Sequence, residues 1–121
     1  MAEHTDLGKI GEEIAVQYLI KNGFEIIVRN YKYDRAELDV IAESPEGILV
    51  FVEVKTRHTD FFGDPEGFVS SSKIKQLLKA ADGYLQENEW KGDARFDIIG
   101  IIKNKNEERL KHVKDAFYFF Q

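Results

Sequence analysis

The stretch that decides the fold is residues 48–57, ILVFVEVKTR, where a glutamate and a lysine interrupt the most apolar strand-like segment of the chain. Side chains alternate along a strand, so Glu53 and Lys55 point to the same face, about 7 Å apart. Leu49 and Phe51 share that face, which therefore begins apolar and becomes charged toward its C-terminal end. The opposite face carries only aliphatic residues and must be buried: Ile48, Val50, Val52 and Val54.

A second predicted strand, 36–43, precedes this one and brings further carboxylates. Glu37 and Asp39 share one side of it. Its apolar residues share the other side: Leu38, Val40 and Ala42. The turn SPEG at 44–47 predicts an antiparallel hairpin, so Asp39 should lie across from Glu53 or near it. Two or three carboxylates and one lysine would then share a patch of sheet.

Such a patch favours a divalent cation, because closely spaced carboxylates repel one another unless a proton or a cation lies between them. Mg²⁺ prefers oxygen ligands and typically combines one or two carboxylates with water and substrate phosphate oxygens. A neighbouring lysine can orient a water or stabilise charge that builds up on the phosphate. The alternative is a solvated Glu–Lys pair worth about 0–1 kcal/mol. The valines on either side of Glu53 favour a central strand over that alternative.

The rest of the chain predicts one α/β domain covering residues 1–121, a length that suits a single hydrophobic core. The predicted elements, in order, are a helix (8–22), three strands (24–31, 36–43 and 47–57), a loop (58–72), a helix (73–86) and two strands (95–102 and 112–120). Gly23 is placed to end the first helix, and Ser71 or Ser72 to cap the second. This order predicts a mixed central sheet flanked by helices.

Composition narrows the class of protein. No apolar run approaches the ~20 residues needed to span a bilayer, and the polar, acidic N-terminus does not resemble a secretory signal. The chain has no cysteine, which fits a cytoplasmic protein. A net charge of −5 argues against a general nucleic-acid coat. It argues less against an enzyme that gathers carboxylates around a divalent cation.

The order Asp39, hairpin, Glu53-Val54-Lys55 resembles the PD-(D/E)xK nuclease core, a restriction-endonuclease-like α-β-β-β-α-β fold. Nearly the whole chain resembles the YraN family, also called UPF0102, of small bacterial endonuclease-like proteins related to archaeal Holliday junction resolvases. The matching elements are Gly8-x-x-Gly11-Glu12 with Ala15, Tyr18-Leu19 and Gly23, Arg29-Asn30-Tyr31, Glu37-Leu38-Asp39, residues 51–57 (FVEVKTR), Phe62-Gly63, Lys73, Ala80-Ala81, Tyr84-Leu85 and Arg95-Phe96-Asp97.

This resemblance implies a role for each matching position. Asp39 and Glu53 would bind Mg²⁺ or Mn²⁺, and the Val54 carbonyl could add an oxygen ligand. Lys55 would be the catalytic lysine. Glu12 would bring a further carboxylate to the metal, with a helix-surface glutamate as the alternative. The accessory positions are Glu37, Lys73 and Gln76. Ala36 departs from the glycine that the family usually has there, which puts substrate geometry in doubt more than the metal site.

The expected partner is DNA, including branched DNA, and the expected reaction is hydrolysis of its phosphodiesters. Four basic residues could form a local phosphate-binding rim: Arg29, Lys32, Arg35 and Arg57. Cutting both strands of a junction would favour a homodimer. One alternative is a nuclease fold that binds nucleic acid or protein without cutting. Another is a structural domain whose aromatic C-terminus is its interface.

Overall fold

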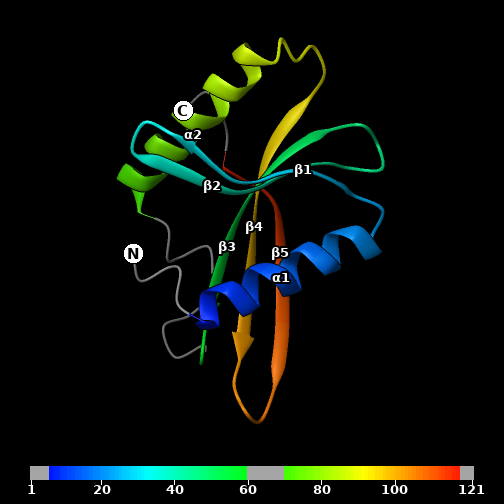
Figure 1. Cartoon of the computed structure of the whole chain (residues 1–121), viewed down its shortest axis with the longest axis vertical. Coiled ribbons are helices and arrows are strands. Elements are labelled where there is room, and N and C mark those ends of the chain that lie inside the picture. Colours follow the sequence, from blue (N-terminus) through cyan, green and yellow to red (C-terminus); the bar gives the residue numbers. More distant parts are fainter. Residues whose placement is uncertain (1–5, 60–69, 118–121) are drawn as a thin grey trace.

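The computed structural model describes residues 6–59 and 70–117 and contains one mixed five-stranded sheet with two helices. The elements are α1 (Asp6–Lys21), β1 (Glu25–Tyr33), β2 (Ala36–Glu43), β3 (Leu49–Arg57), α2 (Ser71–Glu87), β4 (Ala94–Lys103) and β5 (Glu108–Phe117). The strands lie in the order β1-β2-β3-β4-β5 (Figure 1). Only β3 and β4 are parallel, and α2 connects them. The predicted α-β-β-β-α-β core is therefore confirmed.

The two helices cover opposite faces of the sheet, and β3 contributes to both cores. On one face, Val50 and Val52 of β3 pack in the same core as Ala15 and Leu19 of α1. The other face of β3 packs with α2 and β4, through Leu49, Phe51, Leu77, Ala80, Ala81 and Phe96. The two-faced strand predicted from the alternation of residues 48–57 is confirmed. No helix in the described part of the chain is long and apolar enough to cross a membrane.

Several predicted boundaries were wrong. β5 begins at Glu108, whereas the sequence placed its start at 112. The polarity of this stretch misled that prediction, because Glu108 and Arg109 are exposed strand residues that pair with β4. The second helix begins at Ser71, and the Ser70 hydroxyl caps it by accepting a hydrogen bond from the Lys73 amide at 3.2 Å. Residues 60–69, with Phe62-Gly63, and 118–120 lie outside the described residues.

The prediction that Leu38, Val40 and Ala42 share one face of β2 was also wrong. Leu38 packs in the α2 core, whereas Val40 and Ala42 pack in the α1 core. The alternation breaks at Asp39, between Leu38 and Val40. On the neighbouring strand, Arg29 pairs with Val40 and Tyr31 pairs with Leu38, and the intervening Asn30 has a left-handed backbone with φ 57°. A residue in this conformation reverses the pleat of the strand.

A fork opens in the sheet at the same level. The pairing of β2 with β3 runs from Glu43↔Leu49 to Val40↔Val52 and goes no further. Beyond it, β3 stays paired with β4 as far as Arg57↔Ile102. The C-terminal half of β3, which carries Glu53 and Lys55, therefore has one edge turned away from β2.

Helix α1 lies close to this half of β3. A Cβ atom at Gly11 would overlap the Thr56 side chain, so only glycine permits the helix to approach so closely. The next residue, Glu12, is thereby placed beside the fork. Ala36, where the family usually has glycine, is buried in the α2 core and does not have a positive φ. The alanine is accommodated there without backbone strain.

Candidate active site

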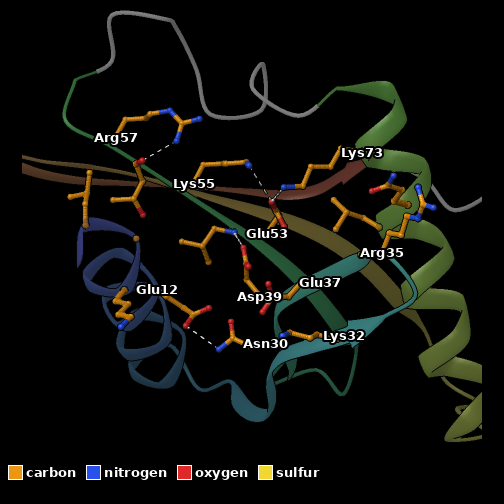
Figure 2. Close-up of a pocket in the computed structure, with 18 of the residues that line it drawn as sticks. Glu12, Asn30, Lys32, Arg35, Glu37, Asp39, Glu53, Lys55, Arg57 and Lys73 are labelled. Carbon is orange, nitrogen blue, oxygen red and sulfur yellow. Dashed lines mark hydrogen bonds and ion pairs between the residues drawn. The ribbon is translucent and has the colours of Figure 1, made fainter. Parts of the chain in front are cut away.

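A cavity of about 750 Å³ occupies the fork between β2 and β3, and residues of both helices complete its walls. Figure 2 shows Asp39 and Glu53 pointing into it from neighbouring strands, with Glu12 on one side and Lys73 on the other. Eleven of the twelve predicted site residues line it: Glu12, Lys32, Arg35, Glu37, Asp39, Glu53, Val54, Lys55, Arg57, Lys73 and Gln76. The structure thus brings together side chains that the sequence placed on two helices, two strands and the turn before the first of these strands.

Glu53 is the most deeply buried acid in the cavity, with a side chain only 3% exposed. Its Oε2 atom lies 3.3 Å from Lys55 Nζ and 3.0 Å from Lys73 Nζ. No described residue donates a hydrogen bond to the other oxygen, Oε1, although that atom is also buried. Buried polar atoms are rarely left without a partner, so the arrangement favours a further positive group at Oε1.

Asp39 lies at the branch point of the fork. Its Oδ2 atom accepts a hydrogen bond of 2.7 Å from the Val54 amide, a donor on the β3 edge that β2 no longer covers. Burial raises the pKa of Asp39 well above its usual value, and repulsion from Glu53 and Glu12 adds to the rise. A cation bound between the two carboxylates would relieve this repulsion.

The two lysines respond differently to the same site. Burial lowers the pKa of Lys55, although attraction to Glu53 opposes the shift. Burial alone would also lower the pKa of Lys73, but attraction to Glu53 outweighs it and the net direction is upward. Both ammonium groups are thus held in the site by their attraction to Glu53.

Glu12 faces the cavity but has other partners. Its side chain is 17% exposed and lines the cavity. Arg29 Nη2 lies 3.3 Å from Glu12 Oε1, and Arg29 Nη1 lies 3.1 Å from Glu13 Oε1. Turned so that its nitrogen faces the acids, the Asn30 amide donates to Glu12 Oε2 at 3.0 Å and to Glu37 Oε2 at 3.2 Å. Arg29, which the sequence placed on the phosphate-binding rim, pairs with acids instead and does not line the cavity.

Basic side chains outnumber acidic ones in the cavity, whereas acidic residues predominate in the whole chain. Six basic and five acidic side chains line the cavity, whereas the chain has 17 basic and 22 acidic residues. The basic ones are Lys9, Lys32, Arg35, Lys55, Arg57 and Lys73. A local excess of positive charge around a carboxylate pair suits a substrate that is itself an anion.

The donor set fits a hard divalent cation that keeps part of its water shell. Among the described residues, no three His, Asp or Glu side chains are grouped so as to hold a metal by themselves. Mg²⁺ does not need such a cage, because it typically uses one or two protein carboxylates together with water and substrate oxygens. The Glu53 oxygen without a donor and the neighbouring Asp39 meet that requirement.

The sequence did not identify a second polar cluster, which lies between α1 and the β4–β5 pair. Asp97 is fully buried, and its Oδ2 atom lies 2.7 Å from His112 Nε2. Its Oδ1 atom accepts hydrogen bonds of 3.0 Å from Arg95 Nε and from the Asp115 amide. The Tyr18 hydroxyl lies 2.9 Å from His112 Nδ1 and extends the network to α1. The aspartate within an apolar strand was the available signal, but its partner histidine lies on another strand.

We expect Asp97→Asn to destabilise the protein by about 3 kcal/mol, because it leaves buried donors unpaired. Burial alone would raise the pKa of Asp97, but the bonds from His112, Asp115 and Arg95 outweigh it, and the net direction is downward. The stability from the ionised group is therefore present above the ordinary carboxyl pKa and is lost as pH falls through the lower folded-state value.

Urea unfolding of the wild type and of Asp97→Asn between pH 7 and pH 3 measures both effects. The wild type should lose more stability over this range than the variant. The exposed Asp93 provides a matched control, as Asp93→Asn. An Asp97→Asn loss no larger than that of the control would contradict the assignment of Asp97 as a structural anchor.

Comparisons with known proteins match this chain over its length. Residues 11–101 match the profile described as "Uncharacterised protein family UPF0102". A UPF0102 protein of Christiangramia forsetii is 49% identical over 120 residues, covering 99% of this chain and 100% of that protein. A UPF0102 protein of Flavobacterium psychrophilum is 47% identical with the same coverage.

One solved structure with a similar fold is a repair endonuclease from Pyrococcus abyssi, with a TM-score of 0.47 and 18% identity. The alignment covers 86% of this chain and 42% of that chain, so this chain spans less than half of the larger protein.

Proposed function

The chain belongs to the UPF0102 family, and we propose that it is a Mg²⁺- or Mn²⁺-dependent endonuclease that hydrolyses the phosphodiester bonds of DNA. The observation that carries this proposal is the placement of Asp39 and Glu53 in one cavity beside Lys55, with a buried Glu53 oxygen that no described residue satisfies. Branched DNA is included among the candidate substrates.

The position of each residue in the cavity suggests its role in the proposed reaction. Asp39 and Glu53 would hold the cation, with the Val54 carbonyl as a candidate third ligand and Glu12 as an outer carboxylate. When bound, the cation would polarise the phosphate and help to deprotonate the attacking water. Lys55, held against Glu53, would orient that water and offset charge that builds up on the phosphate. The water oxygen would form a bond to phosphorus and lose a proton to solvent as the bond to the leaving oxygen breaks, and the leaving oxygen would take up a proton from solvent.

The basic wall of the cavity supports DNA as the substrate. Lys32, Arg35 and Arg57 would contact phosphates on either side of the scissile bond, and Glu37 and Gln76 would position the walls. Phosphate contacts of this kind orient DNA without reading its sequence. Symmetric cutting of a junction would require two copies, so we expect a homodimer on such a substrate.

The rival function is a module that binds nucleic acid without cutting it. One observation favours this function: two ammonium groups already lie against Glu53, so the carboxylate does not depend on a metal for its charge balance. The buried second oxygen of Glu53 and the repulsion felt by Asp39 favour the enzyme. Cleavage assays separate the two.

The decisive assay is a cleavage screen over single-stranded, linear duplex, flapped and four-way DNA with Mg²⁺ or Mn²⁺. We expect strand scission of at least one form, loss of activity on chelation, and no activity in Glu53→Gln. DNA binding without scission of any form, under every metal condition, would support the binding module instead.

A further inference from the structure

Two lysines share a single carboxylate oxygen in this site. Glu53 Oε2 lies within ion-pair distance of both Lys55 and Lys73, at 3.3 Å and 3.0 Å. Lys55 belongs to the same strand as Glu53, whereas Lys73 reaches the carboxylate from the first turn of α2 (Figure 2). One ammonium beside the carboxylate suffices for the proposed chemistry, so the second requires its own explanation.

The two ammonium groups differ in how easily they can move. The Lys55 side chain is 17% exposed, whereas that of Lys73 is 42% exposed. Lys73 therefore borders solvent, and its side chain can change rotamer without disturbing buried neighbours. Lys73 also attracts Asp39, so it acts on both carboxylates that would bind the cation.

We propose that Lys73 is the resident counter-ion of the metal site, which an incoming divalent cation displaces from Glu53. Without a metal, its ammonium offsets the charge of two crowded acids. With a metal, the cation takes over that task and repels the ammonium, because like charges a few ångströms apart in a partly buried site are strongly unfavourable. This inference rests on the proposed function, since it requires a cation at Asp39 and Glu53.

Displacement would let the Lys73 side chain turn along the cavity wall, which Arg35 and Gln76 also line. A phosphate drawn to the basic wall would meet an ammonium group released from its carboxylate. Metal and DNA should therefore bind cooperatively, and the coupling should act equally in both directions. Lys73 is a positioning residue in this scheme, whereas Lys55 keeps its proposed role of orienting the attacking water.

The test is calorimetric titration of Mn²⁺ into the full chain at pH 8 without DNA. Lys73→Met should bind Mn²⁺ about tenfold more tightly than the wild type, because the competing charge is gone. Lys73→Arg, which keeps the charge, should match the wild type. Lys75→Met is the matched control on the same helix, since Lys75 is exposed and does not line the cavity.

A thermal scan gives an independent readout. Lys73→Met should melt below the wild type without metal, because the acids lose a counter-ion, and saturating Mn²⁺ should remove this difference. In Ca²⁺, Lys73→Met should also lose the enhancement of DNA binding that the cation gives to the wild type.

Equal Mn²⁺ affinities in the wild type and Lys73→Met would overturn the counter-ion role and leave the proposed endonuclease standing. Absence of Mn²⁺ binding in both proteins would overturn the counter-ion role and the metal-dependent function together. If Lys73→Met does not fold, Lys73→Gln serves as the second neutral variant, and we expect the same tenfold rise in its Mn²⁺ affinity.

Discussion

Asp39→Asn should abolish metal-dependent cleavage and, in the same protein, raise the melting temperature of the metal-free form. Asparagine keeps an oxygen that can accept the 2.7 Å hydrogen bond from the Val54 amide, so the fork in the sheet is preserved. It removes the charge that burial, Glu53 and Glu12 all disfavour. We expect a gain of about 0.5–2 kcal/mol, which is typical when a destabilising functional group is removed.

The pH dependence distinguishes this effect from a general change in packing. The pKa of Asp39 is raised in the folded state from an ordinary value of 3.8. In the pH window between those two values the folded form holds a proton that the unfolded chain has lost. Stability therefore falls as pH rises through the window, and the loss persists above it. Asp39→Asn should lack this fall.

Chemical unfolding of both proteins from pH 4 to pH 8 measures the difference, and Asp34→Asn is the control. Asp34 also lines the cavity, but its side chain is 60% exposed, and its loss should change neither stability nor metal binding. An Asp39→Asn variant that is less stable than the wild type at neutral pH would contradict the proposed electrostatic conflict.

The second large effect is expected for Lys55→Met, in the rate of DNA cleavage. This substitution should lower the cleavage rate by about 10³-fold, within the range typical of a lost acid–base or charge-stabilising group. Divalent-cation affinity should not fall, because both carboxylates remain and the loss of an ammonium 3.3 Å from Glu53 removes a competing charge. Methionine preserves the partly buried stem of the side chain, so the fold should remain intact.

Single-turnover cleavage together with Mn²⁺ titration separates the two properties of Lys55→Met. The comparison variant is Lys9→Met, which removes an exposed lysine from the same cavity and should leave the rate within about tenfold of the wild type. Cleavage by Lys55→Met at a rate similar to that of Lys9→Met would remove Lys55 from the reaction.

Much of this site was predictable because alternation along a strand is a short-range rule. Glu53 and Lys55 are two residues apart, and apolar partners mark the opposite face of β3. The hairpin turn at 44–47 fixed which strand came next to it. Placing Asp39 near Glu53 needed only these two local facts, and the structure places both in one cavity.

The rest depends on contacts that the local sequence does not encode. The left-handed backbone of Asn30 shifts the pleat of β1 beside Asp39, and the polar residues around it gave no sign of this. Lys73 reaches Glu53 only because α2 returns across the sheet. Asp97 and His112 meet through the pairing of β4 with β5, a register that no short motif specifies. Each case requires knowledge of which distant segments become neighbours.

The central claim is that Asp39 and Glu53 together bind one divalent cation. The most direct measurement is a crystal of the full chain soaked in Mn²⁺ and recorded at a wavelength where manganese scatters anomalously. We predict a single anomalous peak in the cavity, contacting oxygens of both carboxylates, with Lys73 Nζ moved away from Glu53. A cavity without an anomalous peak, or a peak that neither carboxylate contacts, would contradict the claim.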